Sequence, residues 1–359
     1  MPEMSAFCPV LSCRPCDGRF CVVFFRVVLR LVFLRVLERC DVERRRDVPP
    51  RVLDCFVIAQ MFLITPIISW KNVKDRRAAP APLASPAGNA YSRTMHNGAM
   101  QALYDGDLPY FRFTHFPEDG VQSHAVFTRH GGVSPAPFDS LNLSVSVPDS
   151  RDNVYANRAR AYGIVGRDTG SVVHAHLVHG ADVAQVTRAD DGTWRAHFDG
   201  LITDEPGCAL TMNYADCAPI FIYDPARRAI GLGHAGWQGA VRDLPGALVR
   251  AMQAAFGSRP ADLLAAVGPS IGPCCYEVGE PVVGQVRARF SGAASLLHDN
   301  GGPRPHFDLP GANRQRLLDA GVRQIQMSGI CTACRTDLFF SHRAEKGTTG
   351  RFGVIFMLS

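Results

Sequence analysis

The 359-residue sequence lacks an uninterrupted apolar segment long enough to cross a bilayer. Residues 20–37 are apolar but include three arginines, and an arginine costs roughly 2.5–3.5 kcal/mol at the centre of a membrane-spanning helix. Residues 55–70 form the other apolar run, which contains Pro66 and falls short of the about 20 residues that a spanning helix needs. The ordered basic, apolar and small-residue regions of a secretory signal are also missing. We therefore do not expect a membrane partner or secretion.

The sequence also lacks a basic excess on its larger part. The formal charge is +5, but residues 1–79 carry 14 Lys and Arg against 8 Asp and Glu, which leaves 24 against 25 for the rest. A nucleic-acid-binding domain carries its positive charge as a patch or stripe on the folded part. Nucleic acid is therefore not an expected partner. A content of 47% hydrophobic residues also excludes disorder of the whole chain.

The first 94 residues differ in composition from the rest. They are rich in Arg, Val and Cys, show little periodicity, and end after a linker-like Ala- and Pro-rich stretch at 76–90. Met95 and Met100 follow as candidate starts. We interpret 1–94 as an atypical leader, either disordered or the product of an upstream mis-start, and 95–359 as one folded domain.

A disulfide framework is not expected from the twelve cysteines, because such frameworks belong to small secreted domains without a sufficient core. Reduced thiols fit a cytoplasmic protein and can act as metal ligands or nucleophiles. Six cysteines lie in the leader, where a single C-x2-C step is weak evidence for zinc. The other six are at positions 208, 217, 274, 275, 331 and 334.

The pattern of apolar residues from 108 onward predicts an α/β domain. Regular βαβ alternation is missing, which favours mixed sheets with helices outside over a Rossmann or barrel arrangement. Short apolar runs bounded by turn residues predict strands, and apolar residues recurring on one face predict helices. We expect strands at 123–129, 208–214, 219–224, 229–234, 262–268 and 351–358, and helices at 151–164, 241–257 and 310–322.

Two histidines and a cysteine form a candidate metal site. His179, Cys217 and His234 lie in the segments HLVHGADV, NYADCAP and GHAGWQG. Imidazole and thiolate are ligands that zinc prefers, and three protein ligands with an open fourth position are typical of catalytic zinc. Cys217 and His234 flank two predicted strands joined by a turn at Asp224, so a hairpin can bring them together.

The same residues also allow a mechanism without metal. The thiolate of Cys217 would be the nucleophile and His234 its base, while Asp216 or Asn213 would orient the histidine. From the residues alone, both mechanisms stay open.

Polar loops provide candidate ligands for an anion. In the segment 127–144, Gly131 and Gly132 let a ligand approach the backbone beside Arg129, or simply form a hairpin turn. Near the end of the chain, polar side chains are typical of a pocket rim, and a guanidinium there can bind phosphate bidentately. These rim residues are Ser341, His342, Arg343 and Arg351.

The remaining cysteines are not expected to bind metal. Cys274 and Cys275 are adjacent, which makes it difficult for both to serve one tetrahedral site, so we expect them to pack. Cys331 and Cys334 have C-x2-C spacing, but no second pair lies near them in sequence. We therefore do not expect a structural zinc.

Several dispersed motifs in a fixed order, covering roughly 108–358, resemble the laccase-domain family, once described as multicopper polyphenol oxidases and now as zinc-dependent purine nucleoside phosphorylases. The motifs are FTRHGGVS, SLNLS, HLVHGADV, DGLITDEPGCALTMNYADCAPI, GHAGWQG, GPSIGPCCYEVG, FFSHR and TGRFGVI. The resemblance implies a four-layer α/β/β/α single domain. It also implies a zinc ion, with copper as the alternative, held by His179, Cys217 and His234.

The activity implied by the resemblance is phosphorolysis of purine nucleosides. Adenosine, inosine, guanosine and S-methyl-5′-thioadenosine would react with phosphate to give the free base and the corresponding (methylthio)ribose 1-phosphate. Zinc-dependent deamination of adenosine is the second implied activity. Asp216 is the candidate proton donor, although its place beside a metal-binding thiolate also fits a supporting role.

The sequence departs from the family pattern at two places. Leu177 stands where the family has glutamine before VHG, and Gln238 stands where it has arginine after HAGW. Gln238 lacks a positive charge near the metal, so Arg129 becomes the preferred phosphate ligand. Ser341, Arg343 and Asn142 complete the expected substrate and phosphate set.

Two other classes of function remain alternatives. A copper-dependent polyphenol oxidase requires clustered His-x-His motifs or a His/Cys/Met copper set, and neither stands out. A Cys–His hydrolase or deamidase with Cys217 as nucleophile is supported because the fold resembles the catalytic domain of the cytotoxic necrotizing factor toxins. Activity of a metal-free preparation distinguishes the two roles of Cys217. The metal-free protein would stay active if Cys217 is a nucleophile and would be inactive if Cys217 is a metal ligand.

Overall fold

The computed structural model describes residues 98–117 and 123–358. The apolar run at 55–70, the leader cysteines and the expected domain boundary after residue 94 lie outside the described residues, so these expectations stay predictions. Among the described residues, no helix combines the length and the apolar character needed to traverse a bilayer.

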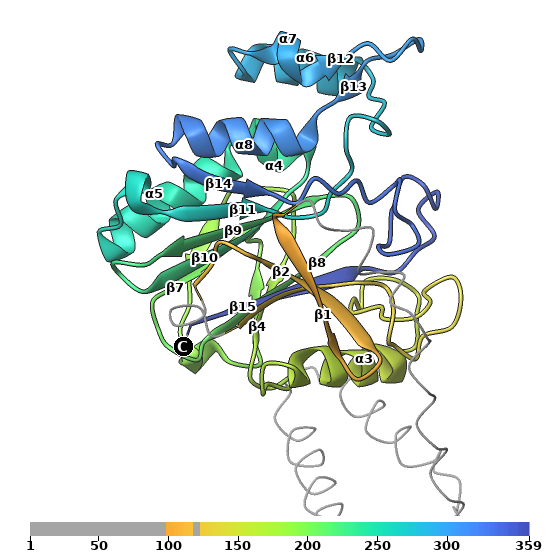
Figure 1. Cartoon of the computed structure of the whole chain (residues 1–359), viewed down its shortest axis with the longest axis vertical. Coiled ribbons are helices and arrows are strands. Elements are labelled where there is room, and N and C mark those ends of the chain that lie inside the picture. The colour runs from red at the N-terminus through yellow and green to blue at the C-terminus, as the bar shows by residue number, and fades with distance from the viewer. Residues whose placement is uncertain (1–97, 118–122, 359) are drawn as a thin grey trace, which may run out of the picture. The chain divides into compact units, whose positions relative to one another are not determined.

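Two mixed β-sheets pack face to face, and helices cover their outer faces (Figure 1). Helix α3 (Arg151–Gly163) packs on the seven-stranded sheet through Ala161 and Tyr162. Helices α4 (Trp237–Val241), α5 (Leu244–Phe256) and α8 (Leu309–Asp319) cover the six-stranded sheet. The predicted four-layer α/β/β/α domain is confirmed.

The seven-stranded sheet has the order β1-β2-β3-β15-β8-β4-β6. Its pairs are antiparallel from β1 to β8 and parallel where β4 joins β8 and β6. The strands are β1 (Met100–Asp105), β2 (Leu108–Phe113), β3 (Ser123–Phe127), β4 (Val173–His176), β6 (Trp194–Ala196), β8 (Ala209–Tyr214) and β15 (Phe352–Met357).

The six-stranded sheet has the order β14-β11-β9-β10-β7-β5. Its two outermost pairs are parallel and its central pairs are antiparallel, so the prediction of mixed sheets is confirmed for both layers. The strands are β5 (Val183–Gln185), β7 (Gly200–Thr203), β9 (Ala218–Asp224), β10 (Ala229–Ala235), β11 (Leu264–Val267) and β14 (Gln324–Met327).

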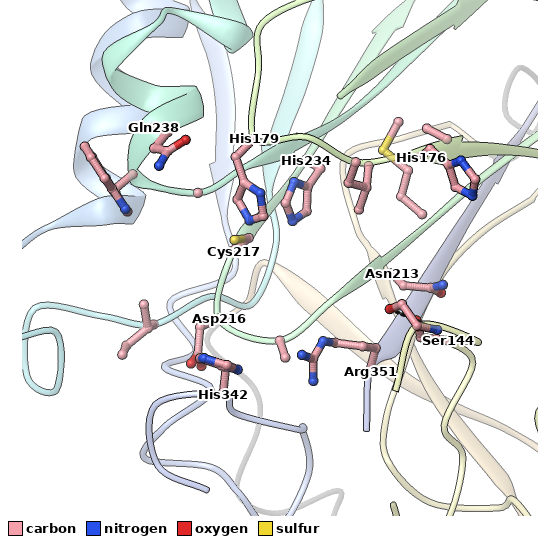
Figure 2. A pocket seen from close by; sticks show the side chains of 18 of the residues that line it. Ser144, His176, His179, Asn213, Asp216, Cys217, His234, Gln238, His342 and Arg351 are labelled. Carbon is pink, nitrogen blue, oxygen red and sulfur yellow. Dashed lines mark hydrogen bonds between the residues drawn. The ribbon is translucent and has the colours of Figure 1, made fainter. Parts of the chain in front are cut away.

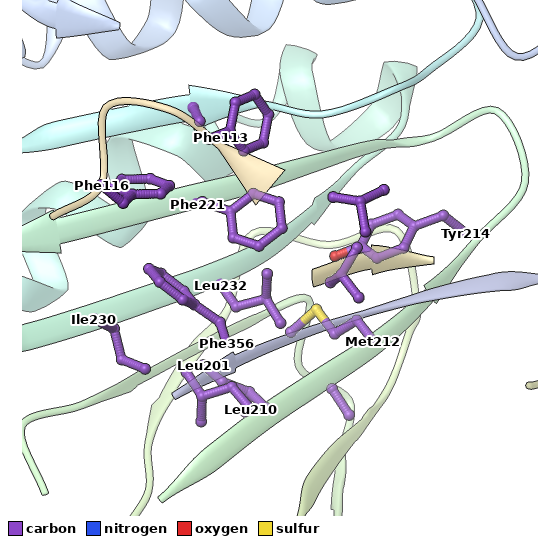
Figure 3. Close-up of a cluster of buried hydrophobic side chains, with 14 of the residues drawn as sticks. Phe113, Phe116, Leu201, Leu210, Met212, Tyr214, Phe221, Ile230, Leu232 and Phe356 are labelled. Atoms are coloured by element: carbon purple, nitrogen blue, oxygen red, sulfur yellow. The ribbon is translucent and has the colours of Figure 1, made fainter. Parts of the chain in front are cut away.

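The main core lies between the two sheets (Figure 3). Strand β9 is buried along its whole length because its two faces meet different layers. Phe221 packs into the core between the sheets, whereas Ile220 and Ile222 pack toward α5 and α8. This alternation follows from the period of two along a strand. Burying each such side chain contributes roughly 1.5–3 kcal/mol of hydrophobic free energy.

The helix predicted over 241–257 is confirmed as α5, but it begins three residues later than predicted and a separate short helix, α4, precedes it. Helix α4 ends at Val241 and α5 begins at Leu244, with Asp243 between them in a left-handed conformation at φ 66°. The Asp243 carboxylate accepts a hydrogen bond from the backbone N–H of Gly246 and so caps α5. The capping aspartate therefore sets the start of α5 at Leu244 rather than at Val241.

A small group of elements follows β11 and was not predicted. Helices α6 (Glu280–Arg289) and α7 (Ala293–Leu296) and the hairpin of β12 (Leu297–His298) and β13 (His306–Phe307) share a core with α4 and α8. The loop before α6 runs from this group to the pocket described next.

Candidate functional site

The hairpin of β9 and β10 places Cys217 beside His234. Its register pairs Pro219 with His234, and Cys217 directly precedes β9. The turn is held by the carboxylate of Asp224, which accepts the backbone N–H groups of Ala226 (2.9 Å) and Arg227 (3.0 Å). The prediction that a hairpin brings this cysteine and histidine together is confirmed.

His179 joins them from the loop between β4 and β5. The ligand atoms of His179, Cys217 and His234 all lie within 4.8 Å of one another. Figure 2 shows the three side chains pointing toward one another, and the two imidazole rings are 5.0 Å apart at 76°. His179 has a positive φ of 57°, so the loop that carries it must be held by other contacts.

Asp199 provides those contacts and was missed at the level of sequence. Its fully buried carboxylate accepts the backbone N–H groups of Val178 (3.0 Å), His179 (3.1 Å) and Gly180 (2.7 Å). It also bonds Nδ1 of His234 at 3.0 Å. Burial alone would raise the pKa of Asp199, but His234 and these N–H groups lower it, so the group stays ionised.

The prediction that Asp216 or Asn213 orients His234 is therefore wrong. Asp199 directly precedes β7. Its only signal in the sequence is that it is an acidic residue at the start of an apolar strand. Because Asp199 fixes the proton on Nδ1 of His234, the other ring nitrogen is left to face Cys217.

The charges of Cys217 and His234 support each other. Burial raises the pKa of the Cys217 thiol, but His234 and His179 outweigh this and lower it to about 6. Burial lowers the pKa of His234, but the Cys217 thiolate and Asp199 outweigh this and raise it to about 10. A thiolate beside two imidazole nitrogens is a donor set that fits zinc. Nδ1 of His234, the nitrogen that faces away from Cys217, is held by Asp199, as is usual for metal-binding histidines.

Asp216 is held in place by three donors. Its Oδ1 accepts the hydroxyls of Thr332 and Ser341, both at 2.7 Å, and its Oδ2 accepts the backbone N–H of Arg343 at 2.7 Å. Asp216 itself has a positive φ of 84°. This network joins the Cys217 loop to two later segments of the chain. It also explains why Ser341 is fully buried and does not line the pocket.

A pocket of about 640 Å³ opens beside His179, Cys217 and His234. This volume lies within the range of about 300–1,000 Å³ that is typical of small-molecule sites. Figure 2 shows Asp216, His342 and Arg351 below Cys217, on the opposite side from His179 and His234. Other polar or aromatic residues that line it are Ser144, Ser146, His174, His176, Trp194, Thr211, Asn213, Trp237, Gln238, Tyr276 and Arg343.

Arg129 does not line the pocket, contrary to the expectation that it binds phosphate. Its guanidinium bonds Glu345 at 3.0 Å and the carbonyl of Thr336 at 2.8 Å, lies near Asp139, and stacks on Phe340. The side chain is 10% exposed, and its donors serve to join distant parts of the fold. The sequence shows that an arginine is present, but not that the carboxylates of Glu345 and Asp139 lie against its guanidinium.

Asn142 and Gly132 stabilise the fold and do not bind a ligand. The buried side chain of Asn142 bonds Asp149 at 2.9 Å and the carbonyl of Ser144 at 3.2 Å, and does not line the pocket. A Cβ on Gly132 would lie 2.1 Å from the carbonyl oxygen of Ser140. Close contact between two backbone segments, rather than approach of a ligand, therefore requires glycine there.

The four cysteines for which no common metal site was expected lie together. The sulfur atoms of Cys274, Cys275, Cys331 and Cys334 are all within 4.8 Å of one another. Local sequence does not indicate this grouping, because the fold brings the turn at 273–275 against the turn at 332–334, two segments far apart in sequence.

Comparison with known proteins gives one family. Residues 123–359 match the model of the family described as multi-copper polyphenol oxidoreductase laccase. The sequence is 41% identical over 234 residues to purine nucleoside phosphorylase YlmD of Geobacillus stearothermophilus, covering 62% of this chain and 85% of that protein. It is 36% identical over 230 residues to purine nucleoside phosphorylase YfiH of Escherichia coli, covering 62% and 88%.

Solved structures agree with the sequence matches. The crystal structure of YlmD from G. stearothermophilus has a TM-score of 0.68 at 37% identity, covering 72% of this chain and 98% of that one. A structure described as Bacillus licheniformis hypothetical protein YfiH also has a TM-score of 0.68, at 32% identity, covering 73% and 100%.

Proposed function

Because the chain belongs to the multi-copper polyphenol oxidoreductase laccase family, and relatives at up to 41% identity are named purine nucleoside phosphorylases, we propose that it is a purine nucleoside phosphorylase. The observation that carries the proposal is the convergence of His179, Cys217 and His234 at one pocket that also contains arginines. The proposed substrates are phosphate and the purine nucleosides adenosine, inosine, guanosine and S-methyl-5′-thioadenosine.

We assign His179, Cys217 and His234 as ligands of a zinc ion. All three line the pocket, so an ion they hold would face a bound substrate. When bound, zinc supplies a Lewis acid that can stabilise negative charge or activate a water molecule. Asp199 is the positioning residue, because it holds both the loop of His179 and the ring of His234.

Phosphorolysis requires a cationic site for phosphate near the ribose. Arg343 and Arg351 line the pocket, whereas Arg129 does not, so the proposed phosphate site moves to this pair. Arg343 is oriented by a bond from its guanidinium to the carbonyl of Glu277 at 2.8 Å and by stacking over Tyr276 at 5.0 Å. Asp216 fixes the same segment by accepting the backbone N–H of Arg343.

A proton must reach the departing base. Asp216 is poorly placed to donate it, because both of its oxygens accept hydrogen bonds from other groups. His342 lies beside Asp216 in the pocket, and imidazole is the side chain most often suited to proton transfer near neutral pH (Figure 2). We assign His342 as the proton donor and Asp216 as a positioning residue.

Deamination of adenosine is the second proposed activity. It is favoured by the accessible side of the His179, Cys217 and His234 group, which faces the pocket. Oxidation of phenols is less well supported. Among residues 98–117 and 123–358, two groups of side chains could hold a metal. One contains two histidines and the other contains none, unlike the histidine-rich sites of multicopper oxidases.

The decisive experiment is chromatographic analysis of the products from adenosine, with and without phosphate, before and after chelation and return of zinc. Adenine that depends on both phosphate and zinc supports phosphorolysis. Inosine without adenine makes the protein a deaminase only. Product formed equally well by metal-free protein favours the Cys217 hydrolase instead.

A pair of cysteine variants controls the experiment. Cys217→Ser removes a proposed ligand and should abolish product formation. Cys208→Ala removes a thiol that is buried outside the pocket and should leave product formation intact. The thiols of the described cysteines are free, which suits the reducing cytoplasm that we propose as the location.

A further inference from the structure

A second group of cysteines lies outside the proposed active site. Cys274 and Cys275 are on the turn at 273–275, which precedes α6, and Cys331 and Cys334 are on the loop that follows β14. None of these four residues lines the pocket of His179, Cys217 and His234. We propose that the four thiolates bind a structural zinc ion that joins the two turns.

The distances between the sulfur atoms fit a tetrahedral ion. The Cys334 sulfur lies 3.4 Å from that of Cys274 and 3.3 Å from that of Cys275, and all four are within 4.8 Å of one another. Zinc–sulfur bonds of about 2.3 Å at tetrahedral angles place sulfurs roughly 3.8 Å apart. One ion therefore fits between the four sulfurs after small side-chain shifts.

The backbone around the four cysteines stabilises their thiolates. Cys331 and Cys334 have the C-x2-C spacing of a zinc-binding turn, and the backbone N–H of Gly272 donates to the Cys331 sulfur at 3.2 Å. Such a donor offsets part of the negative charge that four thiolates leave on the site. The Pro273 carbonyl accepts bonds from Asn300 and His306, which hold the other turn.

Four cysteine ligands leave no open position, which is the arrangement of a structural zinc and not of a catalytic one. The two turns carry residues that shape the pocket. Tyr276 lines it next to the cysteine pair, and Thr332, between Cys331 and Cys334, donates to Asp216. The ion would thus stabilise the Asp216 network without touching a substrate, whatever reaction the pocket performs.

The test is the zinc content per chain of the full-length protein, measured by mass spectrometry under native conditions. Cys334→Ser should lose one zinc relative to the unmodified protein, Cys217→Ser should lose a different one, and the double variant should lose both. Cys208→Ser should lose none. Differences between variants are used because the leader contains six further cysteines. An unchanged zinc content in Cys334→Ser would overturn the proposal.

A spectroscopic measurement keeps the proposal testable if Cys334→Ser fails to fold. In the Cys217→Ser protein loaded with Co²⁺ in place of zinc, strong thiolate-to-cobalt charge-transfer absorption should remain, since four thiolates would still bind the ion. Its absence would count against the site. A disulfide-linked peptide joining 273–275 to 332–334, or iron in place of zinc in the purified protein, would also overturn the assignment.

Discussion

Asp199 and His234 form a buried pair in which the carboxylate oxygen lies 3.0 Å from Nδ1 of the imidazole. The same carboxylate holds the backbone of His179. One aspartate therefore sets the positions of two proposed zinc ligands that are supplied by different elements of the fold.

Asp199→Asn should weaken zinc binding at this pocket by about 10- to 100-fold, the range usual for loss of a carboxylate that orients a metal-binding histidine. The amide keeps the volume but removes the charge that stabilises His234. Isothermal titration of the metal-free protein with zinc measures the change. Asp224→Asn is the matched control, because Asp224 is also buried but lies at the turn of the β9–β10 hairpin, at the opposite end from His234. Equal losses in both variants would show a general effect on folding.

The parts of this site that are close along the chain can be predicted from the sequence. Cys217 and His234 lie on one hairpin, whose strands and turn are visible as local patterns. Asp199 is 35 positions from His234, and its role depends on how β7 pairs with β10. A strand register of this kind is set by packing and was not readable from local pattern.

Arg129 and the cysteine group illustrate the same limit over longer separations. The two glycines near Arg129 predict a phosphate ligand, but the carboxylate of Glu345, 216 positions away, binds its guanidinium. Cys274 and Cys334 are 60 positions apart, and only the fold makes them neighbours. Local chemistry therefore predicted the residue types correctly and their partners poorly.

Gly236→Ala should impair zinc binding and activity together. A Cβ at this position would lie 2.7 Å from the Cys217 sulfur and 3.5 Å from Cδ2 of His179, so the proposed ligands would have to move. Zinc content and product formation measure the effect. Gly163→Ala, at the end of α3, introduces a methyl group with no atom within 4 Å and should leave both unchanged. Full zinc content in Gly236→Ala would contradict the assigned ligand set.

Arg343→Met should raise the KM for phosphate on the order of 10- to 100-fold, because a charge-assisted hydrogen bond contributes about 1.5–3 kcal/mol. Initial rates at varied phosphate concentration measure it. Arg129→Met is the matched variant and should leave this KM unchanged while lowering the free energy of unfolding. The loss should be below the about 3–5 kcal/mol of a fully buried pair, since Glu345 is 22% exposed. The reverse pattern would restore Arg129 as the phosphate ligand.

The charge pair of Cys217 and His234 gives the metal-free protein a defined pH dependence. The pKa of Cys217 is lowered from 9.0 to about 6, so its stabilising contribution is complete above pH 9 and is lost as pH falls through 6. The pKa of His234 is raised from 6.5 to about 10, so its contribution is complete below pH 6.5 and is lost as pH rises through 10. The two groups are charged together between about pH 6 and 10.

Metal-free protein should therefore contain a Cys217 thiolate at neutral pH. The ultraviolet absorbance of thiolate, taken as the difference between the unmodified protein and Cys217→Ser, should appear as pH rises through about 6 rather than about 9. Cys208 is the internal control, because burial raises the pKa of its thiol to about 12 and Cys208→Ala should leave this transition in place. A transition near 9 for Cys217 would mean that the imidazoles of His234 and His179 do not stabilise its charge, and the zinc-binding group would then lack the electrostatic support inferred from its geometry.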